Sequence, residues 1–67
     1  MPQTDLRELA KRIQARANSP KVKEIVYEQS AQGMYVYFKD GTATLVGTAG
    51  LSDRVITERV LAAIAKH

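Results

Sequence analysis

The sequence has no cysteine, no tryptophan and a single histidine, His67, which is its last residue. Without cysteine the chain forms no disulfide, thiol nucleophile, iron–sulfur cluster or cysteine-ligated zinc site. A lone histidine at the chain end, where chains usually fray, excludes a Ser-His-Asp triad and any metal site that needs two histidines. We therefore expect no catalytic residue, no metal, no cofactor and no small-molecule substrate, and we predict that the protein is not an enzyme.

Long apolar runs are also missing. The longest, residues 60–65, is far shorter than the roughly 20 residues that span a bilayer. Residues 1–5 do not lead into the apolar segment of a signal peptide. These features predict no membrane partner and a cytoplasmic location, or the host cytoplasm if the chain belongs to a mobile element.

The chain has 67 residues, of which 45% are hydrophobic and 25% are charged. Both fractions are ordinary for a folded domain. A chain of this length buries roughly 60% of the surface that its unfolded form exposes, which is enough for one small core. We expect a single domain over residues 1–67.

Two segments have the apolar spacing of an amphipathic helix. The first, over about residues 6–17, is capped by Asp5 and stopped by Pro20. The second, over about residues 52–66, has Ser52 as its N-cap. Their apolar stripes consist of Leu6, Leu9, Ala10, Ile13 and Ala17 in the first helix and of Ile56, Val60, Ala63 and Ile64 in the second.

Between the helices, residues 22–28, 34–39 and 42–46 are rich in β-branched and aromatic side chains, which predicts three strands. Asp40-Gly41 favours a two-residue type I′ turn, in which both central residues have positive φ. That turn makes Phe38 face Ala43, and opposed residues share a face of the sheet. The core side of this hairpin is then Met34, Val36, Phe38, Ala43 and Leu45. The other side is Tyr35, Tyr37, Lys39, Thr42, Thr44 and Val46.

The predicted order is αβββα, a single small α+β domain in which a three-stranded antiparallel sheet carries two helices on one face. This order over nearly the whole chain, with VYE at residues 26–28, resembles the double-stranded-RNA-binding domain. In that family the second helix opens with a lysine cluster that grips phosphates, whereas this chain has SDRVI at residues 52–56. The helix–hairpin–helix order also resembles small phage head-completion proteins.

The positive charge is concentrated near the N-terminus. Residues 1–23 carry six basic and two acidic side chains, whereas residues 24–67 carry four and five. A basic strip on one element is typical of a phosphate-binding surface, and a solvated helix face is the alternative. We predict that the protein contacts nucleic acid through this strip. The candidate nucleic-acid-binding residues are Lys11, Arg12, Arg16, Lys21, Lys23 and Lys39.

The sheet face that the helices leave open is a second candidate site, for a protein partner or for self-association. Val22/Val26 and Ile25/Tyr27 compete for the core side of the first strand, and that choice stays open. If Val22 and Val26 point inward, an apolar and aromatic patch remains exposed, of the kind that marks an interface. The candidate interface residues are Ile25, Tyr27, Tyr35, Tyr37 and Val46. This alternative predicts a protein-interaction module, such as a homodimer or a phage or mobile-element adaptor.

Overall fold

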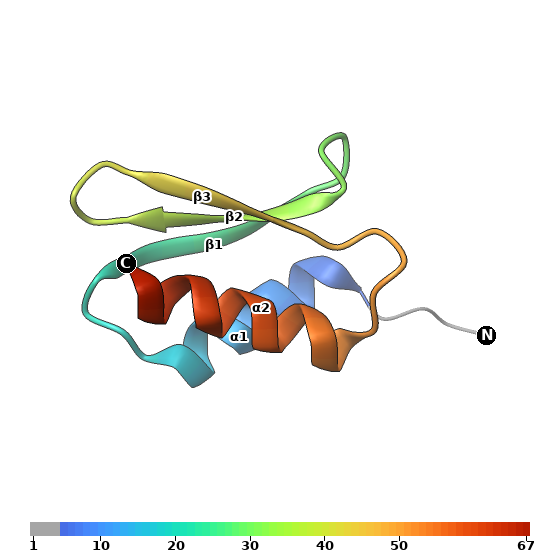
Figure 1. Cartoon of the computed structure of the whole chain (residues 1–67), viewed down its shortest axis with the longest axis horizontal. Helices are drawn as coiled ribbons and strands as arrows, with labels where there is room; N and C mark the ends of the chain where they lie inside the picture. The colour runs from blue at the N-terminus through green and yellow to red at the C-terminus, as the bar shows by residue number, and fades with distance from the viewer. Residues whose placement is uncertain (1–4) are drawn as a thin grey trace.

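The computed structural model describes residues 5–67 and has the predicted αβββα order (Figure 1). Its elements are α1 (Leu6–Ala17), β1 (Val22–Glu28), β2 (Gly33–Phe38), β3 (Ala43–Gly47) and α2 (Asp53–Lys66). The strands form one antiparallel sheet in the order β1-β2-β3. Both helices lie on the same side of this sheet, and its other side is uncovered (Figure 1). The predicted α+β fold is confirmed, and every element begins and ends within one residue of its predicted bounds.

Local side-chain and backbone contacts fix the ends of both helices. The Asp5 carboxylate accepts a hydrogen bond from the Arg7 amide at the start of α1, and the Ser52 hydroxyl accepts one from the Val55 amide in α2. α1 ends because Asn18 adopts the left-handed conformation, with φ 43°, while its amide donates to the Gln14 carbonyl. Asparagine tolerates this conformation better than most residues, so the helix ends at Ala17, three positions before Pro20.

The turn between β2 and β3 differs from the predicted one. The Phe38 carbonyl accepts from the Gly41 amide, and the Phe38 amide donates to the Thr42 carbonyl, so three residues rather than two form the loop. Within this loop only Gly41 has a positive φ, at 93°, whereas a type I′ turn also needs one at Asp40. The Asp40 side chain instead accepts from the Thr42 amide and hydroxyl, which stabilises the longer loop. Three-residue loops of this kind carry glycine at the last position.

The longer loop shifts the pairing of β3 by one residue. Tyr35 lies opposite Leu45 and Tyr37 opposite Ala43, so the predicted pairs are wrong. A one-residue shift moves every side chain of the strand to the other face. Leu45, predicted in the core, is 46% exposed, and Val46, predicted as an exposed interface residue, is buried with 7% exposure.

A bulge in β1 determines which of its residues point toward the core. The pairing with β2 shifts between Val22 and Glu24, so that Val22 and Ile25 both point toward the helices. Strict alternation would have separated these residues, since they lie three apart, and the extra residue of a bulge brings them to one face. Ile25, predicted at the interface, is only 3% exposed and belongs to the core.

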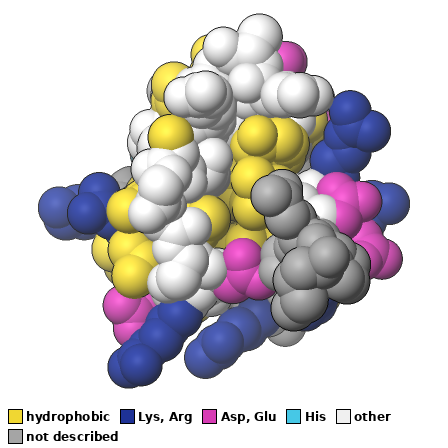
Figure 2. Space-filling view, turned by 90° about the vertical axis from the view of Figure 1, so that its right-hand side faces the viewer, with side chains coloured by type: hydrophobic (Ala, Val, Ile, Leu, Met, Phe, Trp, Pro, Cys, Tyr) yellow, Lys and Arg dark blue, Asp and Glu magenta, His cyan; other side chains and the backbone are white. Residues whose placement is uncertain are grey.

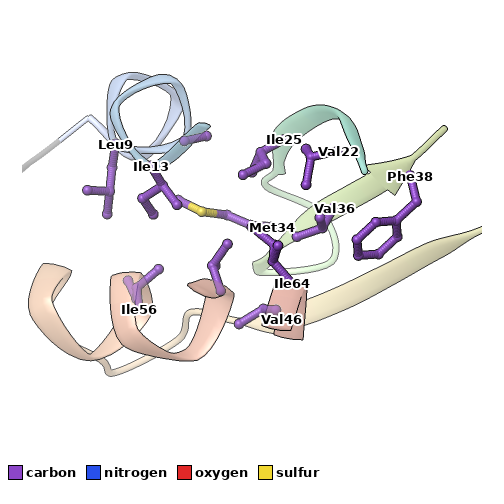
Figure 3. Packing of buried hydrophobic residues seen from close by; sticks show 12 residues of the cluster. Leu9, Ile13, Val22, Ile25, Met34, Val36, Phe38, Val46, Ile56 and Ile64 are labelled. Atoms are coloured by element: carbon purple, nitrogen blue, oxygen red, sulfur yellow. The ribbon is translucent and has the colours of Figure 1, made fainter. Parts of the chain in front are cut away.

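The core lies between the sheet and the two helices. Figure 3 shows Met34 reaching from β2 toward Ile13 of α1, with Ile56 and Ile64 of α2 on the other side. The buried hydrophobic residues are Leu9, Ala10, Ile13, Val22, Ile25, Met34, Val36, Phe38, Val46, Ile56, Val60 and Ile64. Every strand and both helices contribute to this list, so neither helix can leave without exposing the apolar side of the sheet.

Two alanine substitutions in the β2–β3 hairpin test this register. Phe38→Ala should lower the free energy of unfolding by about 3–5 kcal/mol, because a buried aromatic ring leaves a cavity. Leu45→Ala should cost much less, about 1 kcal/mol, because this residue is 46% exposed and lies outside the core. Urea unfolding of the two variants measures the difference. A Leu45→Ala cost equal to that of Phe38→Ala would mean that the predicted two-residue turn is the correct one.

Candidate interaction surfaces

The uncovered side of the sheet, called the outer face below, carries an aromatic and aliphatic strip. Tyr35 and Tyr37 project from β2 with their rings stacked, 5.8 Å between centroids and 25° between planes. Leu45 of β3 lies beside Tyr35, and Val26 of β1 lies on its other side. Tyr37 and Leu45 are the large hydrophobic residues that the described chain leaves exposed, at 40% and 46%. Apolar groups of all three strands therefore meet on a surface that no part of residues 5–67 covers.

Gly33 allows Leu45 to lie flat on this face. A Cβ at Gly33 would be 2.7 Å from Leu45 Cδ1 and 2.8 Å from the Val46 carbonyl oxygen, closer than such atoms approach. Gly33 is itself buried beneath the leucine. The absence of a side chain at the start of β2 thus lets the isobutyl group cover the backbone and extend the strip along the sheet.

Acidic residues border the strip on one side. Glu24 pairs with Tyr37 and Glu28 pairs with Gly33, and opposed residues share a face, so both carboxylates belong to the outer face. Both glutamates are exposed. β3 contributes only Ala43, Leu45 and Gly47 to the same face, without any charge. The bulge also places Lys23 beside Glu24, in a hollow that Tyr37 lines as well. β1 therefore brings two acids and one base to this face, and the net negative charge suits a protein surface better than a nucleic acid.

Of the five predicted interface residues, two lie on the outer face and three lie on the helix side of the sheet. Tyr35 is half-buried and Tyr37 exposed on the outer face, as predicted. Tyr27 is half-buried on the helix side, where it packs against the core. Ile25 and Val46 are inside the core and cannot contact a partner. The sequence interpretation missed Leu45 and Val26 as residues of the outer face. Glycine at position 41, the third residue of a three-residue loop, is the sequence signal for the register that exposes Leu45.

The six predicted nucleic-acid-binding residues are all exposed, but they do not form one strip. Lys11 and Lys23, together with Arg7, line a groove between α1 and β1. Arg12 and Arg16 lie on the opposite flank of α1, in a groove against α2 that Asp53 and Glu58 also line. Figure 2 shows basic side chains around the edges of one face of the molecule, with acidic ones between them. The basic side chains of α1 are thus divided between two grooves.

Lys21 and Lys39 lie at the end of the molecule where α2 finishes. The Lys21 ammonium group donates to the Ile64 carbonyl at 3.2 Å, and this carbonyl, at the negative end of the α2 dipole, also accepts from the His67 amide. The Lys39 amide donates to the Lys21 carbonyl at 2.9 Å. Lys21 therefore has a structural contact that ties the start of β1 to α2.

His67 joins the same end, although the sequence predicted that it would fray. Its ring stacks on Phe38, with 3.7 Å between centroids, and its Nε2 atom lies 2.8 Å from Asp40 Oδ2 and 3.3 Å from Thr42 Oγ1. Hydrogen bonds from the Thr42 hydroxyl and amide, and then from His67, hold the pKa of Asp40 at about 2, well below its ordinary value. The hydroxyl and the carboxylate face the same ring nitrogen. A proton relay needs them on different nitrogens, so this geometry is not a catalytic triad.

No protein family, curated protein or solved structure matches this chain. Within the described residues 5–67, no helix is both long and apolar enough to cross a membrane.

Proposed function

We propose that the protein is a non-catalytic protein-interaction module that binds through the outer face of its sheet, and that the occupant of this face is a second copy of the chain. The observation that carries the proposal is the stacked Tyr35–Tyr37 pair beside an exposed Leu45. Tyrosine offers a flat apolar ring with a polar tip, which suits a surface that is alternately free and bound.

The charge pattern of the outer face favours a twofold pairing with itself. The charged residues of this face, Lys23, Glu24 and Glu28, lie on β1, whereas the outer face of β3 is uncharged. With a twofold axis running along the strands, β1 of each copy lies over β3 of the other. The carboxylates of the two copies then stay apart, and the tyrosines meet at the centre. Two-copy assemblies with this symmetry are the commonest oligomers of soluble proteins.

The size of the face predicts a weak and reversible dimer. Strands of five to seven residues, about 4.8 Å apart, give a face of roughly 15 by 20 Å. That is well below the area of about 800 Å² that each partner buries in a standard stable interface. We therefore expect association in the micromolar range or weaker.

Two adjacent residues of β3 provide a matched test. Leu45→Glu places a charge in the outer face and should weaken dimerisation by roughly 100-fold, because burying an unpaired charge costs several kcal/mol. Thr44→Glu adds the same charge on the other face and should leave dimerisation nearly unchanged. Sedimentation velocity over a wide concentration range measures both. A wild-type protein that stays monomeric throughout, or a Leu45→Glu variant that associates like the wild type, would contradict the proposal.

Nucleic-acid binding is our second proposed function, and the groove between α1 and β1 supports it. Arg7 and Lys11 of α1 and Lys23 of β1 line this groove with one acid, Glu24. A backbone phosphate in the groove would meet three cations. The groove between α1 and α2, in contrast, has three cations, Arg12, Arg16 and Arg54, but two acids, and Arg54 is paired with one of these, Glu58, at 3.6 Å.

A salt titration tests this second function. Labelled duplex DNA, duplex RNA and single strands are titrated at two salt concentrations. Binding to duplex DNA should weaken with a slope near −0.9 per phosphate contacted, for roughly three to five contacts. Lys11→Glu with Lys23→Glu should weaken binding more than Arg12→Glu with Arg16→Glu, since the second pair already faces acids. The absence of binding at low salt would rule the function out.

A further inference from the structure

The two edges of the sheet are not equivalent. α1 packs along β1, and the Gln14 side-chain oxygen accepts a hydrogen bond from the outward Ile25 amide at 3.1 Å. The β1 edge is therefore closed to another strand by a helix and by a side chain that takes one of its donors. β3 forms the other edge, and among the described residues it pairs only with β2.

The hydrogen bonds at the two ends of β3 show which of its backbone groups are free. The Thr42 carbonyl accepts from Phe38, and the Thr48 amide donates to the Gln32 carbonyl. In an antiparallel pair, every second residue points its amide and carbonyl toward the partner strand. The backbone groups of Ala43, Leu45 and Gly47 therefore point outward, away from β2. An exposed row of this kind is a template for a further strand.

A groove with a volume of about 530 Å³ runs beside this edge, between β3 and α2. Residues 44–47 form one wall, and Arg59, Ala62, Ala63 and Lys66 of α2 form the other, with His67 at one end. The small alanine side chains leave room between strand and helix. The groove carries two cations and none of its lining residues is acidic. Its charge thus complements an acidic ligand.

We propose that the β3 edge is a docking site for an extended acidic segment of a partner protein, which adds to the sheet as a fourth strand. Backbone hydrogen bonds to Ala43, Leu45 and Gly47 would hold the segment, as in other cases of strand addition. This site goes beyond the proposed dimer because it uses the edge of the sheet and not its outer face.

The charge of α2 selects a partner protein over a second copy at this edge. Pairing β3 with β3 of another copy would bring the two α2 helices side by side, each with Arg59 and Lys66 in the groove. Like charges placed together in this way disfavour the assembly. These two cations are seven residues apart, or about 10 Å along the helix. Acidic residues at alternate positions of a strand, about 7 Å apart on one side, can reach both.

The probe for this site is a synthetic hexapeptide of alternating glutamate and valine with blocked ends. Amide hydrogen exchange by NMR is followed with and without it. In the free protein the amides of Thr44 and Val46 should be protected, while those of Ala43, Leu45 and Gly47 exchange fast. The peptide should slow exchange at Ala43, Leu45 and Gly47. A peptide with lysine in place of glutamate, and one with N-methylated valines, should not bind.

Two charge-matched double variants locate the site. Arg59→Glu with Lys66→Glu should weaken peptide binding roughly tenfold, because two ion pairs are lost. Arg7→Glu with Lys11→Glu removes the same charge from α1 and should have a clearly smaller effect. Equal effects of the two pairs, equal binding of the N-methylated peptide, or no binding at low salt would overturn the proposal. Concentration-dependent protection of these amides without peptide in the Leu45→Glu variant, which lacks the outer-face dimer, would also overturn it, since a second copy would then occupy the edge.

Discussion

The three-residue loop from Lys39 to Gly41 determines the arrangement of this small domain. Its positive φ at Gly41 and the hydrogen bonds from Thr42 to the Asp40 carboxylate set the point at which β3 begins to pair with β2. Because side chains alternate along a strand, this point decides that Val46 enters the core and that Leu45 faces outward. Phe38, at the start of the loop, is held on one side by the core and on the other by the ring of His67.

A second constraint is the size of the chain. Two helices and three strands supply one core, and both helices are used to cover one face of the sheet (Figure 1). The outer face and the β3 edge are consequently left without a partner inside the described chain. Both proposed binding surfaces, the outer face and the β3 edge, are therefore exposed because the two helices cover the same side of the sheet. The outer face offers aromatic and aliphatic side chains, whereas the edge offers backbone groups beside two cations.

Periodicity and capping were sufficient to predict the helices, because Asp5 and Ser52 act locally and the apolar stripes contact the core. The strands were also predictable from their composition. Their registers were not predictable, since each depends on one extra residue. In β1 this residue forms the bulge after Val22, and between β2 and β3 it lengthens the loop, which the Thr42–Asp40 hydrogen bond stabilises. The same two features explain why Ile25 and Val46 were wrong as interface residues. The basic residues of α1 are divided between two grooves because α1 lies between β1 and α2. The sequence of α1 alone does not predict this packing.

The register of the β2–β3 hairpin is the central claim, because the core, the outer face and the free edge all depend on it. A NOESY spectrum tests it directly, since Hα atoms approach closely in the non-hydrogen-bonded pairs of an antiparallel ladder. The structure predicts strong Hα–Hα signals between Tyr35 and Leu45 and between Tyr37 and Ala43. Signals between Val36 and Leu45 and between Phe38 and Ala43 would instead show the two-residue turn, and would contradict both proposed surfaces.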